Sequence, residues 1–474
     1  MLEQTIHAGY NSVCDCFSEM SALIRNVFVC LLCLFVATNV PAQVANGVSA
    51  LERGDKDKAK LFFEQALKTD PQNLDAHTYL GILADKANQL AEAERHFAAA
   101  ASLAPSEPST RNNYGAILMR LGRTDQARVE FEASLKLNPN QPSALTNLAQ
   151  IYFDRGQLDD LKKARSLLER VGTSDPEVSR ALVITYLKLG QVLMEKGDVR
   201  GAGRTFESAV ASGIDDAKIY AALAEVYEAD GRYENAIPAM RLAVQRDLQN
   251  EVYHFRYGLL LTDSHAPGAG IVRLQEALKQ FPNLSRLWLA LGIAQLTLGQ
   301  NAEAESSFKR SLTLDAKLVP ALAYLAVTYG ERGQNDKAID FYEQAIALNP
   351  QLGALHYLIA DTILKTSNAD TTRAERYLRR ATELDPHLAA AYLAWGRLYV
   401  RANRYNEAAP LLERAVALQP ELVEAHYQLS RVLVKLKRTG EANRELAIFK
   451  QLTEKQKAQN EAREIVRRLA NVRF

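Results

Sequence analysis

A small residue recurs along the chain, in most cases at steps of 34 residues, as between Ala304 and Ala338. Four residues after each comes a large apolar side chain, such as Phe308 or Tyr342, and this i, i+4 spacing places both on one helix face. The other small residues in this place are Ala59, Ala93, Ala127, Ala164, Ala202, Ala236, Gly270, Ala374, Ala408 and Ala442. A packing pattern rewritten at a short period predicts a stack of equivalent units rather than separate globular domains.

Each period predicts two helices joined by a tight turn. The first half, seen in "WLALGIAQLTLGQ" (Trp288 to Gln300), has apolar residues at helical spacing, a small residue for close approach, and a polar turn at its end. The second half usually ends in a proline such as Pro350, which cannot continue a helix. The sequence therefore predicts a chain of antiparallel helix pairs.

This pattern resembles the tetratricopeptide repeat family, in which a Trp-like residue, Leu-Gly, Tyr, Ala, an aromatic residue, Ala and Pro follow one another over 34 residues. The resemblance covers about residues 40 to 456 as roughly twelve repeats. It implies an all-α, right-handed superhelical solenoid with the first helices on its concave face. We place the solenoid at residues 43–456, with longer segments near Leu161 and before Val183, and a C-terminal capping helix at residues 457–474.

The N-terminus has the layout of a secretory signal peptide. Arg25 precedes the apolar stretch "VFVCLLCLFVAT" (Val27 to Thr38), and small residues follow it up to Ala42. We expect translation to start at Met20 and a signal spanning residues 1–42 to be removed; an uncleaved membrane anchor is the alternative. All four cysteines lie in this segment, at Cys14, Cys16, Cys30 and Cys33, so the mature chain would contain none. The sequence predicts an extracytoplasmic protein, periplasmic or secreted.

Composition argues against disorder and against nucleic acid as a partner. Hydrophobic residues make up 47% of the chain and charged residues 24%, enough for a continuous core. The formal net charge is +1, and acidic and basic residues are interspersed, so the long-range positive field of a polyanion-binding protein is missing. The basic run from Arg376 to Arg380 is predicted to be a solvated helix face.

No motif for catalysis, cofactor binding or metal binding was found. His77, His254, His356 and His426 all occupy the register position that Trp288 holds in a sister repeat, which indicates packing rather than chemistry. Phosphate-binding loops, nucleophile elbows and zinc-binding spacings do not occur. We therefore expect a protein that is not an enzyme and that uses no cofactor or small-molecule substrate.

The resemblance also implies candidate peptide-binding residues. Family members place an asparagine at the sixth position of successive repeats, where its amide can pair with the main chain of an extended peptide. Asn113 and Asn147 stand there in two consecutive repeats. Tyr79, Lys188, Tyr257 and Tyr324 complete the predicted set at the same position of other repeats. The basic and amide groups with which chaperone-binding members grip a terminal carboxylate are incomplete, because Thr78 and Ile82 stand in two of their places.

The function that the sequence favours is a non-catalytic scaffold that binds extended segments of other proteins in a groove. One alternative is a structural subunit of a cell-envelope assembly, such as a pilus or outer-membrane machinery, working through its outer face and ends. The other is an enzyme with a cryptic site. Membrane contact is expected only through an uncleaved N-terminal segment.

Overall fold

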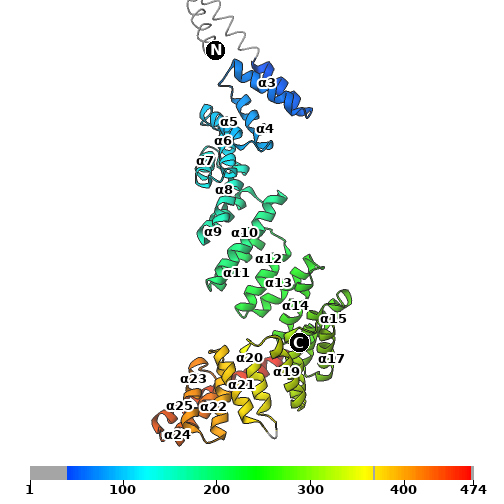
Figure 1. Ribbon diagram of the computed structural model, residues 1–474, viewed down its shortest axis with the longest axis vertical. Helices are drawn as coiled ribbons and strands as arrows, with labels where there is room; N and C mark the ends of the chain where they lie inside the picture. The colour runs from blue at the N-terminus through cyan, green and yellow to red at the C-terminus, as the bar shows by residue number, and fades with distance from the viewer. Residues whose placement is uncertain (1–39, 367–368, 471–474) are drawn as a thin grey trace, which may run out of the picture. The chain divides into compact units, whose positions relative to one another are not determined.

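The computed structural model describes residues 40–366 and 369–470, with side chains up to residue 457. This part of the chain contains helices and no strand, so the all-α prediction is confirmed. The helices follow one another as antiparallel pairs and fall into two compact units, which divide between Asp230 and Gly231 (Figure 1). Below, "first helix" and "second helix" mean the two members of a pair.

Unit one begins with a first helix at residues 40–52 and closes with the first helix α12. Its other helices are α3 (Lys56–Thr69), α4 (Leu74–Lys86), α5 (Leu90–Leu103), α6 (Pro108–Arg120), α7 (Thr124–Leu137), α8 (Pro142–Arg155), α9 (Leu158–Val171), α10 (Pro176–Glu195) and α11 (Val199–Ala211), and α12 spans Ala217–Ala229. The first helix α10 has 20 residues where its neighbours α8 and α12 have 14 and 13. The extra residues before Val183 therefore extend a helix, as the sequence indicated.

Unit two begins with the second helix α13 and continues in the same alternation. Its helices are α13 (Tyr233–Arg246), α14 (Glu251–Asp263), α15 (Pro267–Gln280), α16 (Ser285–Thr297), α17 (Asn301–Leu314), α18 (Val319–Glu331), α19 (Asn335–Leu348), α20 (Gly353–Ile363), α21 (Thr371–Leu384), α22 (Ala389–Arg401), α23 (Tyr405–Leu418), α24 (Val423–Lys435) and α25 (Thr439–Ala470). Each first helix packs chiefly on the second helix of its own pair.

The two helices of a pair are joined by a turn that needs a left-handed residue. After α16 this residue is Gly299, with φ of 79°, and after α4 it is Asn88, with φ of 60°. Glycine and asparagine tolerate this conformation better than other residues. The amide of the next residue, Gln300, then bonds back to the carbonyl of Gln295 at 2.9 Å, which satisfies a carbonyl at the end of α16.

The recurring small residues form the closest contacts of the core. Ala304 and Ala338 are completely buried, and so are their counterparts at Ala59, Ala93, Ala127, Ala164, Ala202, Ala236, Ala374 and Ala408. The side chain four residues later is buried on the same face, as Phe308 and Tyr342 show. The register read from the sequence is therefore confirmed by burial. These residues hold neighbouring helices at a distance that only a methyl group fits.

A glycine in each of several first helices makes room for the phenylalanine of the same pair. A Cβ atom placed on Gly292 would lie 2.5 Å from Cε1 and 2.6 Å from Cδ1 of Phe308. The same relation joins Gly47 to Phe63, Gly81 to Phe97, Gly115 to Phe131 and Gly190 to Phe206. Every phenylalanine at this core position thus faces a glycine, because ring and methyl group cannot share the space.

Hydrogen bonds between tyrosine and glutamate join consecutive pairs. The hydroxyl of Tyr329 on α18 donates to Oε1 of Glu305 on α17 at 2.8 Å. The hydroxyl of Tyr399 on α22 donates to Glu375 on α21 at the same distance. In each case the tyrosine lies late in a first helix, and the glutamate lies on the preceding second helix. These contacts fix the rotation of one pair against the next.

The predicted domain limits fall inside helices. Residues 1–39, which hold nearly all of the proposed signal peptide, lie outside the described residues, but residues 40–52 are helical and Val40 is buried. The boundary after Ala42 would therefore cut the first helix of the first pair. At the other end α25 runs without interruption from Thr439 to Ala470, so the expected capping helix is a continuation of the last second helix. None of the described helices is both long and apolar enough to cross a membrane.

Candidate functional site on the first helices

The outward sides of the first helices form a continuous surface within each unit, which we call the first-helix surface. First helices of consecutive pairs contact each other, as α6 does α8 and α22 does α24. A side chain on one first helix is therefore within reach of the equivalent side chain one repeat away. This arrangement can hold an extended polypeptide along several repeats, because each repeat supplies a similar set of positions at a regular spacing.

The two predicted asparagines lie on this surface, but their hydrogen bonding differs from the prediction. Asn147 Nδ2 donates to Oδ1 of Asn112, at 3.2 Å, rather than standing free beside Asn113. Asn112 is buried, whereas Asn113 and Asn147 are half-buried. Of this trio, Asn113 alone makes no hydrogen bond to another described side chain. The directly consecutive Asn-Asn pair was the only sequence signal that pointed to Asn112.

Two of the predicted tyrosines stack on core phenylalanines. Tyr79 lies over Phe63 with ring centroids 4.9 Å apart and an interplanar angle of 8°. Tyr324 lies over Phe308 at 5.8 Å and 15°. Both rings cover the core with one face and remain partly accessible on the other, a position suited to a ligand contact. Lys188 is exposed on α10.

Tyr257 does not occupy the position that the sequence analysis gave it. It directly precedes Gly258, the residue of close approach, and it is only 9% exposed. The sixth residue of α14 is Arg256, one place earlier. A shift of one residue turns a side chain by about 100° around a helix, so Tyr257 faces its neighbours in the protein instead of a ligand.

An apolar notch lies beside Asn147. It has a volume of about 120 Å³ and is lined by α8, α9 and α10, with Thr146, Ala149, Phe153, Leu168 and Ile184 among its walls. Ile184 is 54% exposed, an unusual state for a large aliphatic side chain. Amide groups next to a small apolar notch match what an extended peptide presents, namely main-chain polar groups and one side chain. The sequence gave no sign of this notch, because α10 contributes to it through its insertion.

The recurring histidines perform the packing role that was predicted for them. His254 Nε2 lies 3.1 Å from the carbonyl oxygen of Leu248, six residues earlier. His77, His356 and His426 make the equivalent contact with Pro71, Pro350 and Pro420. Trp288 Nε1 donates in the same way to the carbonyl of Pro282 at 2.9 Å. This position thus ties each first helix to the loop before it, which explains why it alternates between histidine and tryptophan.

Clusters of possible metal ligands were sought in the same residues. No group of three or more histidine, cysteine, aspartate or glutamate side chains occurs among those that the structure describes. His77 and His96 approach each other with their Nδ1 atoms 3.1 Å apart. Burial, and secondly the neighbouring His77, lowers the pKa of His96, so its ring favours the neutral form.

The fold and this surface define a helical-repeat solenoid of the kind that binds other proteins. Models of the tetratricopeptide repeat match residues 50–117, 118–182, 187–251, 285–318, 319–352 and 393–447, which together are more than half of the chain. The chain therefore belongs to the tetratricopeptide repeat family. Proteins of this family are in general non-catalytic scaffolds for protein interaction.

Similar proteins include a TPR repeat-containing protein of Methanocaldococcus jannaschii, which is 27% identical over 198 residues. These residues are 40% of this chain and 34% of that protein, so the chain spans about a third of the length of this curated relative. Among solved structures, yeast Tom70 matches 91% of this chain and 97% of its own at 17% identity and a TM-score of 0.45. MamA matches 35% of this chain and 97% of its own at 21% identity and a TM-score of 0.32.

Proposed function

We propose that this protein is a non-catalytic scaffold that binds extended segments of other proteins on its first-helix surface, outside the cytoplasm. The observation that carries the proposal is the combination, in unit one, of the Asn112–Asn147 amide pair, the unengaged amide of Asn113 and the apolar notch beside them. Amide side chains can both donate to and accept from a peptide main chain, and the notch can take one side chain.

The proposed location depends on the N-terminal sequence. The short apolar stretch behind Arg25 and the confinement of all cysteines to the first 33 residues fit export of the mature chain. A mature protein without cysteine is insensitive to the oxidising conditions outside the cytoplasm. Mass measurement of the protein purified from its host tests this part: an N-terminus near Gln43 agrees with it, and an intact Met1 or Met20 contradicts it.

Site-specific photo-cross-linking tests the binding surface. A photoreactive residue replaces Lys188, which is exposed on the first helix α10, and in a matched variant it replaces Val129, which is 53% exposed on the second helix α7. We expect discrete cross-linked partners from position 188 and none from position 129. Cross-links from position 129 alone would instead favour a structural subunit of a larger assembly that uses the outer helices.

A second variant pair connects the partner to the asparagines. Asn113→Ala removes an amide that holds no other described side chain, so it should lower the yield of cross-linking at position 188 without lowering the melting temperature. Asn140→Ala, in the exposed loop before α8, is the matched control and should change neither. Equal yields for both variants would contradict a role of Asn113 in binding.

A further inference from the structure

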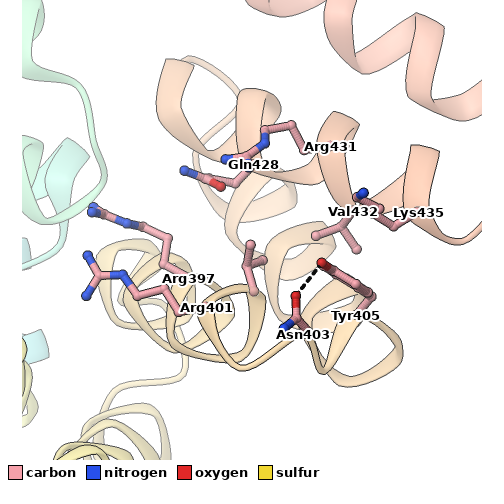
Figure 2. Close-up of a pocket in the computed structure, with 9 residues that line it drawn as sticks. Arg397, Arg401, Asn403, Tyr405, Gln428, Arg431, Val432 and Lys435 are labelled. Carbon is pink, nitrogen blue, oxygen red and sulfur yellow. Dashed lines mark hydrogen bonds between the residues drawn. The ribbon is translucent and has the colours of Figure 1, made fainter.

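A pocket in unit two gathers four cationic side chains. It has a volume of about 310 Å³ and lies between the first helices α22 and α24. Arg397, Arg401, Arg431 and Lys435 line it, together with the amides of Asn403 and Gln428 (Figure 2). The guanidinium groups of Arg397 and Arg401 extend in the same direction in Figure 2, away from the hydrogen bond between Tyr405 and Asn403. No carboxylate lines this pocket.

The four cations come from two equivalent positions in consecutive repeats. Counted from the first residue of each helix, Arg397 and Arg401 are the ninth and thirteenth residues of α22. Arg431 and Lys435 are the ninth and thirteenth residues of α24. Residues four apart on a helix lie on one face, so like charges there repel each other. Two such pairs on neighbouring helices make an array of positive charge on the first-helix surface.

The charge is left uncompensated at this place alone among the comparable repeats. In the preceding repeat the ninth residue from Gly353 is Asp361, whose carboxylate pairs with Lys365 at 2.6 Å. In α8 the ninth and thirteenth residues are Gln150 and Asp154, which are hydrogen-bonded at 2.7 Å. The same two positions are thus internally neutralised or acidic in these earlier repeats.

None of the four cations in the pocket forms an ion pair with any side chain that the structure describes. Arg431 lies over the ring of Tyr427 at 5.5 Å, which leaves its charge uncompensated. By contrast, Arg404 and Arg438 in the adjoining turns are paired with Glu407 and Glu441. Nearby cations on other faces therefore have partners within the protein, and those on the first-helix surface do not.

We propose that this pocket, here called the basic pocket, binds an acidic segment of a partner polypeptide in extended conformation. The proposal rests on the proposed scaffold function and names the chemistry of one segment that it binds. The two cations of one helix are about 6 Å apart along the helix axis. Alternate side chains of an extended chain, which share one face, are separated by about 6.6 Å. Acidic residues at every second position therefore match the cations of α22 or α24.

The walls of the pocket are consistent with a peptide rather than an isolated anion. Val400 and Val432 lie beside the charged groups and offer apolar contact, and Tyr405 contributes a half-buried ring. The amides of Asn403 and Gln428 provide polar atoms for a main chain, although Gln428 Nε2 already donates to Glu424 at 2.6 Å. The pocket is thus mixed in character, with charge at its rim and apolar side chains at its base.

The test uses the full chain and fluorescent peptides of ten residues. One peptide alternates glutamate with serine, and the control peptide has glutamine in place of each glutamate. We expect the glutamate peptide to bind about tenfold more tightly at low salt, and this difference to shrink at 1 M salt, where the Debye length falls to about 3 Å. Equal affinity for both peptides would overturn the proposal.

Paired variants locate the binding. Arg401→Gln combined with Arg431→Gln removes two exposed cations of the basic pocket, and we expect the affinity for the glutamate peptide to fall about tenfold, as for two surface charge pairs. Arg310→Gln combined with Arg376→Gln removes two exposed cations of the second helices α17 and α21 and should leave the affinity unchanged. An equal loss in both double variants would show unspecific attraction and overturn the proposal.

Two further outcomes separate this proposal from the scaffold function. If the cross-linking at position 188 succeeds but the glutamate peptide shows no preference, the basic pocket is refuted and the scaffold function stands. If neither the partner nor any peptide binds, both fail. A single-stranded oligonucleotide of ten residues serves as competitor; displacement of the peptide at equal concentration would assign the pocket to polyanions in general and contradict an acidic peptide as its ligand.

Discussion

The replacement Gly292→Ala tests whether the glycine and phenylalanine of one pair are matched in size. Its Cβ would lie 2.5 to 2.9 Å from three ring atoms of Phe308, which is closer than carbon atoms approach without displacement. The ring cannot move away easily, because it is completely buried and Tyr324 stacks on it. Overpacking of this kind costs about 1–3 kcal/mol. Alanine is favoured over glycine in a helix by about 0.5–1 kcal/mol, so we expect a net loss of about 0.5–2 kcal/mol.

The compensating replacement Phe308→Leu distinguishes this reasoning from a general intolerance of the site. Alone it should cost about 1–2 kcal/mol, because it removes buried ring atoms. Combined with Gly292→Ala, the smaller side chain leaves room for the methyl group, and the double variant should be more stable than the sum of the single effects by about 1 kcal/mol. The chain contains natural precedents, since Ala149 and Ala360 stand four-turn equivalents before Leu168 and Leu378.

Urea unfolding combined with amide hydrogen exchange of α16 and α17 is the appropriate assay, because long repeat arrays need not unfold in one step. Exchange of these two helices should accelerate in Gly292→Ala and return towards the wild-type rate in the double variant. Helices α22 and α23, in the same unit, serve as an internal control. Additivity of the two replacements within about 0.3–0.5 kcal/mol would refute size matching.

Two further predictions concern polar groups. Because burial lowers the pKa of His96, the unfolded chain takes up a proton at higher pH than the folded chain, so thermal stability should fall as pH drops below about 6.5; Glu305, whose pKa is lowered by its hydrogen bond from Lys309, adds a further loss near pH 4. Melting curves from pH 8 to pH 4 test this, and a flat profile would contradict it. His426→Leu removes the 2.8 Å contact to the carbonyl of Pro420 and should cost about 2 kcal/mol in urea unfolding; an unchanged midpoint would show that the contact is dispensable.

The parts of the fold that the sequence predicted are those that every repeat must solve in the same way. Ala338 is buried like its counterparts because each pair of helices must approach closely, and this need imposes one residue type at one spacing. The role of the recurring histidines followed from the same argument, although their carbonyl partners did not. Periodicity is a signal of shared packing, and it is strongest where the packing is tightest.

The site could be predicted only in part, because its residues do not recur. Asn113 was found through a family habit, but the bond between Asn112 and Asn147 joins residues 35 positions apart whose side chains meet only in the folded stack. The basic pocket was missed for the same reason: Arg401 and Arg431 are ordinary surface residues in the sequence and become neighbours through α22 and α24. The error at Tyr257 arose from a register shift of one residue, which reverses a side chain's environment.

The pairing of glycine with phenylalanine has a consequence for how such a chain can grow. Both partners lie within one helix pair, as Gly292 and Phe308 do, so a genetic duplication of one repeat copies the matched residues together. The new copy brings its own compatible core and needs no second mutation elsewhere. The bond between Tyr329 and Glu305, in contrast, crosses from one pair to the next and must be re-formed with whatever neighbour the copy acquires. Recombination within the array is therefore constrained at the junctions between repeats far more than inside them.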